Sequence, residues 1–316
     1  MNTSPKRAVV FAYHNVGVRC LKVLLAGGVD VALVVTHQDS ATENIWFESV
    51  QSLCELEAIP FLTPEDAKGE DLLQAIRAAR PDLMFSFYFR HMLPQAILDV
   101  APAYNMHGSL LPAYRGRAPT NWAVLHGESE AGATLHEMTA KPDAGAIVAQ
   151  QAVPILPDDT AFEVFGKVTV AAELALYHVL PALLAGTAPR IPNDLSKGGY
   201  FGGRKPEDGR IDWSRPARDV YNLHRAVAPP YPGAFTDVGQ GSKMQRYVIE
   251  RARPYRGARA DEISGLPPGL RVLDNAIIGV CGDGRALAIH SLLAKVGENE
   301  MRISPAELQA QLAANP

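Results

Sequence analysis

The sequence predicts an α/β fold: a mostly parallel sheet with helices on both faces, followed by a smaller β-rich domain. In the first half, short apolar runs alternate with amphipathic stretches, as in AVVFAY, VRCLKVLLAG and VALVVT. This alternation is typical of repeated strand–helix–strand units. Beyond residue 209 the apolar runs are short and are separated by GQG, PPG and GDG, which is typical of a small barrel or sandwich.

The elements follow in order along the chain. After the three runs above, WFESVQSLCELE and DLLQAIRAAR are predicted helices, and DLMFSFYF, APAYNMH, TLHEM and AIVAQQAVPI are predicted strands. Thr160 and Glu163 have the spacing of a capping box, which opens a long helix that Gly186 ends. Residues 187–209 are rich in Pro and Gly and lack a period. We therefore expect a catalytic domain over 1–188, a linker over 189–205 and a β-rich domain over 206–316.

Composition places the chain among folded globular proteins. Of its 316 residues, 47% are apolar and 20% are charged. Cys20, Cys54 and Cys281 are isolated and odd in number, so neither a disulfide framework nor a metal knuckle is expected. The first apolar run is too short for a signal peptide, and we expect no later run to span a bilayer. A cytoplasmic protein without membrane insertion is predicted.

The charge is distributed unevenly. From Arg204 onward there are 16 basic and 13 acidic residues, which leaves 30 − 16 = 14 basic and 34 − 13 = 21 acidic residues before it. No Lys or Arg lies between Lys22 and Lys68, which argues against a long nucleic-acid footprint there. The run from Lys243 to Arg259 has six basic residues and one acidic residue. Such a run is most often a solvated face, although it could instead contact phosphates.

Several common active-site motifs are missing from the sequence. The first strand-to-helix turn, FAYHNVGVRC, has one glycine where a dinucleotide fingerprint needs three. There is also no GxxxxGK[ST] phosphate loop, no HExxH and no GxSxG elbow. A three-glycine NAD site is therefore not expected.

The stretch NMHGSLLPAYRGRAP, residues 105–119, carries the strongest chemical signal. Asn105 and His107 are two residues apart on a predicted strand, so they share one face while Met106 packs on the other. An amide can hold an oxyanion while an imidazole moves protons, which suits attack of an amine on a carbonyl. Asp143 is the best candidate to orient the imidazole. The pair alone is not decisive, because a histidine at a strand end is more often structural.

Longer motifs carry a resemblance to a known family. FSFYFRHML (85–93), NMHGSLLPAYRGRAPTNWAVLHGE (105–128), ATLHEMTAKPDAGAIVAQ (133–150), FGGRKPEDGRIDW (201–213) and RAVAPPYPGAF (225–235) resemble the formyltransferases that use 10-formyltetrahydrofolate. The similarity covers almost the whole chain. It implies a Rossmann-like, mostly parallel sheet followed by a small OB-like β-barrel. FAYHNVG and SFYFRH are most similar to members that act on UDP-4-amino-4-deoxy-L-arabinose.

The resemblance implies roles for particular residues. Asn105 would hold the oxyanion, His107 would move the proton from the attacking amine, and Asp143 would raise the basicity of His107. It implies a 10-formyltetrahydrofolate co-substrate and no metal. The residues implied to bind the formyl-folate are His91, Met92, Leu93, Arg117, Thr139, Ala140, Lys141, Pro142 and Asp143.

The acceptor contacts are less specific. His14 and Asn15 follow the first strand, at the edge where such sheets bind ligands. Arg115 could clamp a diphosphate or a folate carboxylate, or it could cap backbone carbonyls. Tyr231 could stack on a uracil ring, although an aromatic residue between prolines is more often packing.

The expected activity is formylation of the 4-amino group of UDP-4-amino-4-deoxy-L-arabinose, for lipid A modification and resistance to polymyxin. The alternatives are formylation of methionyl-tRNA, formylation of another nucleotide-linked amino sugar, and a non-catalytic formyl-folate binder. The tRNA-formylating relatives carry a basic insertion after the second strand, where THQDSATENIWFESV here has no Lys or Arg. Small-molecule substrates are therefore expected rather than a nucleic acid. A separate decarboxylating dehydrogenase is expected to act upstream.

Overall fold

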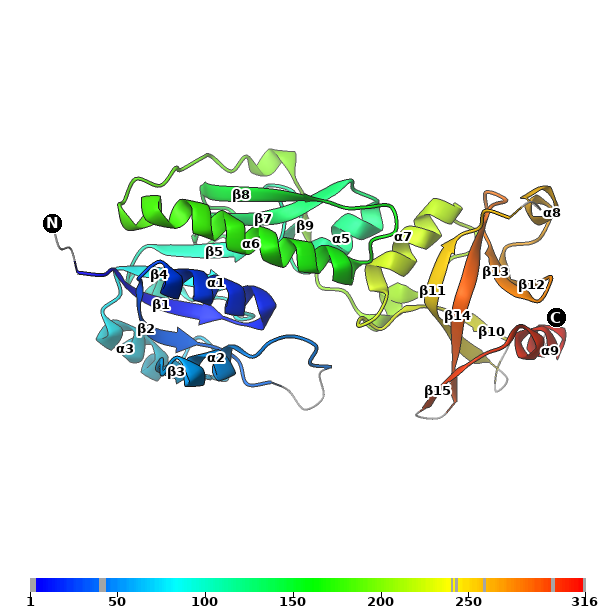
Figure 1. Ribbon diagram of the computed structural model, residues 1–316, viewed down its shortest axis with the longest axis horizontal. Helices are drawn as coiled ribbons and strands as arrows, with labels where there is room; N and C mark the ends of the chain where they lie inside the picture. The colour runs from blue at the N-terminus through cyan, green and yellow to red at the C-terminus, as the bar shows by residue number, and fades with distance from the viewer. Residues whose placement is uncertain are drawn as a thin grey trace. The chain divides into compact units, whose positions relative to one another are not determined.

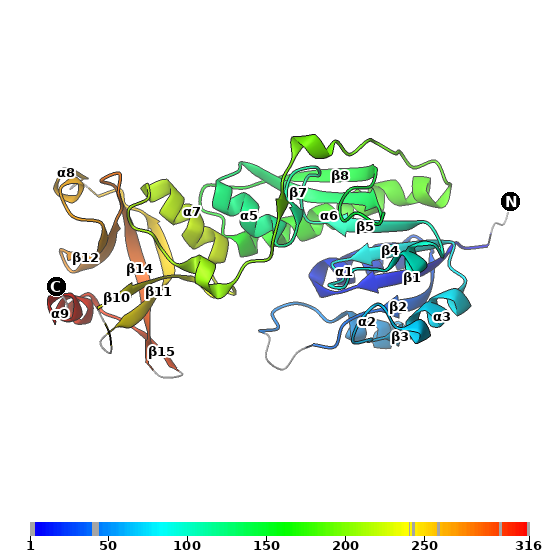
Figure 2. The same ribbon diagram turned by 180° about the vertical axis from the view of Figure 1, so that it is seen from behind.

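The computed structural model describes residues 4–39, 44–239, 241, 244–257, 260–296 and 299–314. The chain forms two compact units, and each is described by itself (Figures 1 and 2). The first unit comprises Met1–Thr120, Glu130–Pro154 and Phe165–Gly203. The second comprises Arg204–Pro316 together with Asn121–Ser129 and Ile155–Val164, two short segments that precede the expected linker.

The first unit is built on a seven-stranded sheet with the order β3-β2-β1-β4-β5-β7-β8. The five strands from β3 to β5 are parallel, and β7 and β8 are antiparallel. The chain leaves β1 toward β2 on one side and returns to β4 on the other, which creates a ligand-binding crevice at the carboxyl ends of these strands. The predicted mostly parallel sheet is thus confirmed. The strands are β1 (Arg7–Ala12), β2 (Asp30–Val35), β3 (Phe61–Leu62), β4 (Leu83–Phe87), β5 (Ala103–His107), β7 (Glu130–Glu137) and β8 (Ile147–Pro154).

Helices cover both faces of this sheet. Val9 and Phe11 of β1 point to the face where α3 and α4 pack, in one buried cluster with Ile76 and Ile97. Helices α1 and α6 lie over the opposite face (Figure 1), where a bidentate pair between Arg19 and Glu173 joins them at 2.6 and 2.7 Å. The helices of this unit are α1 (His14–Ala26), α2 (Val50–Leu56), α3 (Glu70–Ala79), α4 (Gln95–Leu98) and α6 (Ala161–Leu184), whereas most of α5 (Pro119–His126) belongs to the second unit.

Helix α6 begins at the predicted capping box. The Thr160 hydroxyl and N–H both donate to the Glu163 carboxylate, at 2.9 and 2.7 Å, and the Glu163 N–H donates back to the hydroxyl at 3.3 Å. Among the described residues, α6 is long and apolar enough to cross a membrane by length and composition. The expectation that no run is apolar enough is therefore wrong. Half of its apolar window is buried inside the protein, however, and core helices share this composition.

The irregular segment 187–203 belongs to the first unit and pairs with other strands of it. Its strand β9 (Tyr200–Phe201) pairs in parallel with β6 (Arg115–Gly116), and Ile191 bridges to Ile147. A single turn, η1 (Leu195–Lys197), lies between these contacts. The segment has little regular structure, as predicted, but its backbone groups hold the loop that follows β5.

The second unit contains an antiparallel half-barrel sheet with the order β10-β11-β14-β13-β12, and β15 pairs with β14. Helix α7 packs on β11, where His224 Nε2 accepts a hydrogen bond from the Ala252 N–H at 3.2 Å. This unit confirms the predicted small β-rich domain. Its elements are η2 (Pro206–Gly209), α7 (Ala217–Val227), β10 (Ala234–Val238), β11 (Gln245–Pro254), α8 (Ala260–Ser264), β12 (Gly269–Leu273), β13 (Ala276–Val280), β14 (Ala286–Val296), β15 (Asn299–Arg302) and α9 (Pro305–Ala314).

Packing of α6 against the sheet can be tested with two leucines of that helix. Leu176 is completely buried, whereas Leu174 is 39% exposed. Leu176→Ala should lower the free energy of unfolding by about 2–5 kcal/mol, because it removes buried methyl groups and leaves a cavity. The matched variant Leu174→Ala should cost less than about 1 kcal/mol. Equal losses in urea denaturation would contradict this packing.

Candidate active site

A cavity of about 520 Å³ opens at the carboxyl ends of β1, β4 and β5. Its walls come from the residues that directly follow these strands: Tyr13 and His14 after β1, residues 88–93 after β4, and Gly108 after β5. This is the position at which an open α/β sheet is expected to bind ligands. All of the lining residues belong to the first unit.

Strands β5 and β7 place the polar groups of the cavity. Asn105, Met106 and His107 all border it, and Met106 is almost completely buried in the core, at 1% exposure. In the antiparallel ladder, Asn105 lies opposite His136, and His107 lies opposite Thr134. Directly opposed residues of an antiparallel pair project from the same face, so β7 brings a second imidazole into the cavity.

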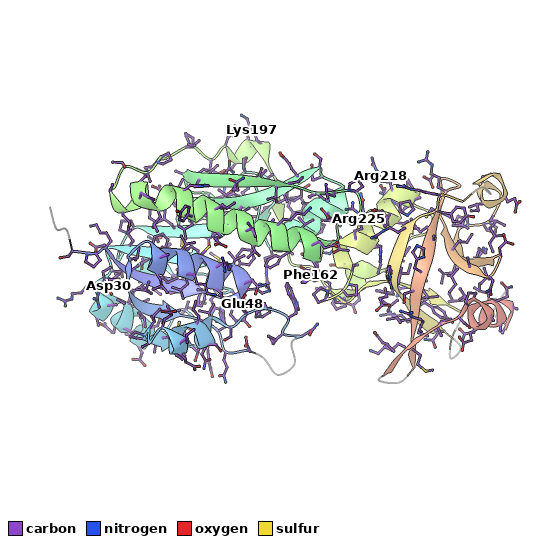
Figure 3. The ribbon with its side chains drawn as sticks, viewed as in Figure 1. Asp30, Glu48, Phe162, Lys197, Arg218 and Arg225 are labelled. Atoms are coloured by element: carbon purple, nitrogen blue, oxygen red, sulfur yellow. The ribbon has the colours of Figure 1, made fainter. Side chains whose placement is uncertain are left out.

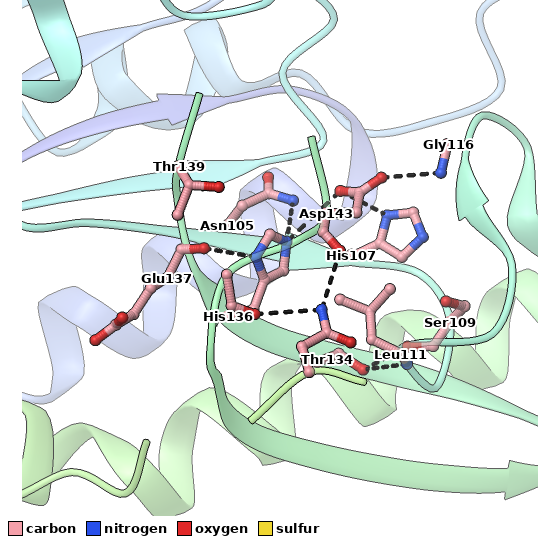
Figure 4. A network of polar contacts seen from close by, with 12 residues as sticks. Asn105, His107, Ser109, Leu111, Gly116, Thr134, His136, Glu137, Thr139 and Asp143 are labelled. Carbon is pink, nitrogen blue, oxygen red and sulfur yellow. Dashed lines mark hydrogen bonds and ion pairs between the residues drawn. The ribbon is translucent and has the colours of Figure 1, made fainter. Parts of the chain in front are cut away.

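The Asp143 carboxylate lies at the centre of these groups (Figure 4). Its Oδ1 is 3.6 Å from Nδ1 of His107 and 3.6 Å from Nε2 of His136. Its Oδ2 accepts a hydrogen bond from the Gly116 N–H at 2.9 Å. Asn105 joins the group through His136, because its Nδ2 lies 3.1 Å from Nε2 of that ring. The three residues predicted as a trio therefore share one cluster with a fourth residue.

Backbone contacts determine which nitrogen of His107 can take a proton. Its Nε2 lies 2.8 Å from the Tyr114 carbonyl oxygen, which only accepts, so Nε2 carries the hydrogen of the neutral ring. The lone pair is then on Nδ1, beside Asp143. Burial lowers the pKa of His107 below its usual 6.5, against the raising effects of the Asp143 charge and the Tyr114 hydrogen bond. Asp143 thus acts in the expected direction, but burial outweighs it and keeps the ring neutral.

The Asp143 carboxylate is held in its charged form. Burial by itself would raise its pKa, but the interactions with His136 and His107 and the hydrogen bond from the Gly116 N–H lower the pKa to about 2. A carboxylate with such a pKa keeps its charge over the whole physiological range. It can therefore stabilise a proton on a neighbouring imidazole without taking that proton itself.

A buried polar network anchors the loop between His107 and Gly116. Thr134 Oγ1 donates to the Ser109 carbonyl at 2.6 Å and accepts from the Leu111 N–H at 3.0 Å. Gln150 Nε2 donates to the Leu111 carbonyl at 2.8 Å. These contacts hold the loop on β7 and β8, so the backbone groups that contact the imidazole and the carboxylate have fixed positions.

Gly116 is required by its backbone geometry. Its φ angle is +99°, which favours glycine. A Cβ atom at this position would collide with the Phe201 carbonyl oxygen of β9. The absence of a side chain thus allows the close approach of β9 while the Gly116 N–H binds Asp143.

Several cavity residues adopt a left-handed backbone conformation that non-glycine residues rarely adopt. These are His14, Tyr88, Ala118 and Asp143, with φ angles of 65°, 60°, 52° and 50°. Each such residue costs about 1–3 kcal/mol, and such residues tend to cluster at functional sites. Their concentration here supports the assignment of this cavity as the active site.

The predicted formyl-folate residues are placed partly on this cavity. Ala140 and Lys141 are not among the lining residues, but the Lys141 carbonyl accepts a hydrogen bond from the Thr139 hydroxyl at 2.9 Å. Among the described residues, no group of three or more His, Cys, Asp or Glu is arranged to hold a metal ion. The predicted residues that line the cavity are His91, Met92, Leu93, Arg117, Thr139, Pro142 and Asp143.

His14 and Asn15, both predicted to contact the acceptor, differ in their placement. The His14 ring lines the cavity and is stacked on Phe47, with 3.9 Å between centroids, and edge-on to Trp46 at 4.6 Å. Asn15 is not among the described lining residues. Its side-chain oxygen accepts a hydrogen bond from the Glu48 N–H at 2.7 Å. Glu48 is labelled in Figure 3. Only His14 of this pair is thus placed to contact a ligand in the cavity.

Arg115 and Tyr231 have surroundings that suit structural roles. Arg115 is 8% exposed, and its guanidinium donates to the Leu195 and Gly198 carbonyls at 3.2 and 2.9 Å. The geometry favours the carbonyl-capping alternative over a diphosphate clamp. Tyr231 lies in the second unit, where burial raises its pKa to about 12 despite a hydrogen bond with Asn121.

Sequence reasoning missed His136 and the backbone groups of Tyr114 and Gly116. His136 lies in the motif TLHEM, which indicated only a strand. Its opposition to Asn105 depends on the register between β5 and β7, and no sequence pattern specifies that register. The carbonyl of Tyr114 and the N–H of Gly116 act through the backbone, so their side chains carry no signal.

Comparison with known proteins identifies the family. A family model described as formyl transferase matches residues 7–180, which is more than half of the chain. A second model, formyl transferase, C-terminal domain, matches residues 204–305. The chain belongs to the formyl transferase family. This confirms the predicted fold class and the predicted class of enzyme.

Solved structures of other proteins share the fold. An N-formyltransferase from Helicobacter canadensis, solved with folinic acid and dTDP-3-aminofucose, has a TM-score of 0.67 and 16% identity over 90% of this chain and 98% of its own. WlaRD, a sugar 3N-formyl transferase solved with dTDP and 5-N-formyl-THF, has a TM-score of 0.68 and 18% identity over 94% and 100%. HypX from Aquifex aeolicus, in complex with tetrahydrofolic acid, has a TM-score of 0.64 and 19% identity over 98% of this chain. The present chain thus spans about half of the length of HypX, 48% of that chain.

The surroundings of His107 lead to a prediction about its titration. In the folded formyl transferase its pKa should be below 6.5, because burial disfavours the imidazolium. Its contribution to stability is therefore complete above the unfolded pKa of about 6.5 and is lost as the pH falls. Asp143→Asn removes a charge that favours the imidazolium, so the pKa should fall further. An NMR titration of the His107 ring checks both shifts, and an increase in the variant would contradict the assignment.

Proposed function

We propose that the protein transfers a formyl group from 10-formyltetrahydrofolate to the 4-amino group of UDP-4-amino-4-deoxy-L-arabinose. The observation that carries this proposal is the buried cluster of Asn105, His107 and Asp143 in a cavity at the ligand edge of the sheet. It combines an amide donor, a neutral imidazole and a fixed negative charge. The formylated sugar would then serve lipid A modification and resistance to polymyxin.

Formyl transfer requires a group that stabilises negative charge and a group that moves a proton. Bound formyl-folate supplies the formyl group, whose carbon the acceptor amine attacks. Asn105 can donate an Nδ2 hydrogen to the formyl oxygen as it gains negative charge. Nδ1 of His107 can take the proton released by the amine and return it to the folate nitrogen as the carbon–nitrogen bond to the folate breaks. The products are an N-formyl sugar and tetrahydrofolate.

Asp143 stabilises the intermediate protonation state of His107. The ring becomes positively charged while it holds the proton, and the carboxylate Oδ1 lies 3.6 Å from the protonated nitrogen. In a buried site this attraction is screened less than in water. The same burial that lowers the pKa of His107 makes the ring ready to act as a base at neutral pH.

The choice of co-substrate and of a sugar acceptor is supported by the relatives. The Helicobacter canadensis enzyme was solved with folinic acid and a dTDP-linked amino sugar, and WlaRD with dTDP and a formyl-tetrahydrofolate. We therefore assign 10-formyltetrahydrofolate and a nucleotide-linked amino sugar to this chain as its substrates. UDP-4-amino-4-deoxy-L-arabinose is the preferred acceptor on the motifs FAYHNVG and SFYFRH.

The alternative acceptor, methionyl-tRNA, calls for an extended basic surface. In the run from Lys243 to Arg259, Arg246 pairs with Asp237 at 3.0 Å and Arg253 lies 3.8 Å from Asp158. Lys243, Ala258 and Arg259 lie outside the described residues. Part of this positive charge is thus neutralised within the second unit, which supports the small-molecule acceptor.

A competition between acceptors tests the proposal. The protein is incubated with 10-formyltetrahydrofolate and either UDP-4-amino-4-deoxy-L-arabinose, a dTDP-linked amino sugar or charged initiator tRNA, and formylation is measured by mass spectrometry. We expect the UDP-sugar to be formylated fastest, with an apparent affinity that depends weakly on salt because few phosphates are contacted. Preferential formylation of the tRNA, with a steep decline as salt increases, would overturn the acceptor assignment.

The role of Asn105 is tested by removing its amide. Asn105→Ala should lower kcat by a factor on the order of 10²–10³, as loss of one oxyanion donor usually does, with little change in the affinity for formyl-folate. Gln74→Ala, which removes an exposed amide of α3, is the control and should behave like the wild type. A variant that loses formyl-folate affinity but keeps kcat would show that Asn105 binds the folate instead.

A further inference from the structure

His136 is the one imidazole in the cluster to which the proposed reaction assigns no step. His136 is 2% exposed, lines the cavity and lies directly opposite Asn105 in the β5–β7 ladder. His136 therefore contacts, from the neighbouring strand, the amide that is proposed to hold the oxyanion. The question is which hydrogen-bonding role this position imposes on the ring.

The backbone determines the tautomer of His136. Nδ1 lies 2.8 Å from the carbonyl oxygen of Glu137. A carbonyl can only accept, so Nδ1 carries the hydrogen of the neutral ring, and Nε2 presents its lone pair. Nε2 lies 3.1 Å from Asn105 Nδ2 and 3.6 Å from Asp143 Oδ1, so the Asn105 contact is the one within hydrogen-bond distance. This is the reverse of His107, where Nε2 donates to the Tyr114 carbonyl at 2.8 Å and Nδ1 has the lone pair.

A lone pair on Nε2 determines the orientation of the Asn105 amide. The atom 3.1 Å from Nε2 is Nδ2 of Asn105, which only donates. If the amide were turned over, its oxygen would face the lone pair and the contact would become repulsive. One Nδ2 hydrogen is therefore used by His136, and the second hydrogen remains for a ligand in the cavity.

We propose that His136 is a positioning residue for formyl transfer: its backbone-determined tautomer holds the Asn105 amide with an N–H available to the formyl oxygen. This inference rests on the proposed function. It assigns no proton transfer to His136, because its Nε2 lone pair is engaged with Asn105. His107 moves the proton, and His136 orients the amide.

The expected consequence is that His136 matters only through Asn105. His136→Leu has a similar size but no acceptor, so it should lower kcat by a factor on the order of 10²–10³, as Asn105→Ala does. His136→Gln can place an acceptor oxygen near the position of Nε2, so it should keep kcat within about tenfold of the wild type. Both should bind folinic acid with an affinity close to that of the wild type. His178→Leu, on the exposed face of α6, is the control.

A double-mutant cycle separates positioning from independent catalysis. The variant that combines His136→Leu with Asn105→Ala should be no slower than Asn105→Ala alone, because the amide through which His136 acts is already gone. Losses that multiply would show that His136 acts independently, for example as a second base, and would overturn the inference. His136→Leu with an unchanged kcat would overturn it as well.

A readout that does not depend on activity keeps the inference separate from the proposed function. In the wild type, ¹⁵N NMR should show the His136 ring as the Nδ1–H tautomer. One side-chain N–H proton of Asn105 should be shifted by its hydrogen bond, and this shift should be lost in His136→Leu and kept in His136→Gln. An Nε2–H tautomer, or an amide that does not respond, would overturn the inference even if formyl transfer is observed. Failure of the wild type to formylate any amine would instead contradict the proposed function.

Discussion

The active site depends on one buried carboxylate that faces two imidazoles. Removing a carboxylate from water is costly unless charged or hydrogen-bonding groups compensate for the loss of hydration. Asp143 accepts a hydrogen bond from the Gly116 N–H at 2.9 Å, and a proton taken up by an imidazole 3.6 Å away would be attracted to its charge. The Gly116 contact in turn needs the left-handed turn of the loop and its close pairing with β9. The carboxylate thus connects the loop after β5 to the segment before residue 204.

The two histidines differ because different backbone carbonyls bind them. The Tyr114 carbonyl binds Nε2 of His107, and the Glu137 carbonyl binds Nδ1 of His136. Each contact leaves one lone pair, which lies 3.6 Å from Asp143 in His107 and is closest to Asn105, at 3.1 Å, in His136. Chemically identical side chains therefore acquire different roles from the backbone around them. In the proposed reaction, this difference lets one ring move a proton while the other orients the amide that holds the oxyanion.

Much of the fold and the shared face of Asn105 and His107 could be predicted from the sequence. The alternation of apolar runs predicted the parallel sheet, and the spacing of Asn105 and His107 predicted a shared face. His136 could not be found in this way, because a one-residue change in register would place it on the other face. The segment 187–203 is held by backbone pairing between β6 and β9. Such pairing does not require particular side chains, so the sequence did not predict it. For Arg115, the sequence left a ligand clamp and a carbonyl cap equally open, and its burial and its carbonyl contacts favour the cap.

The central claim is that His107 and Asp143 act as one unit in formyl transfer. The most direct test is a single-turnover double-mutant cycle with His107→Ala, Asp143→Asn and the variant that combines them, using 10-formyltetrahydrofolate and the UDP-amino sugar. The account predicts that the combined variant is barely slower than His107→Ala alone, because the carboxylate acts only through the imidazole. Rate losses that multiply would show that Asp143 works independently, for instance by holding the folate, and would contradict the account.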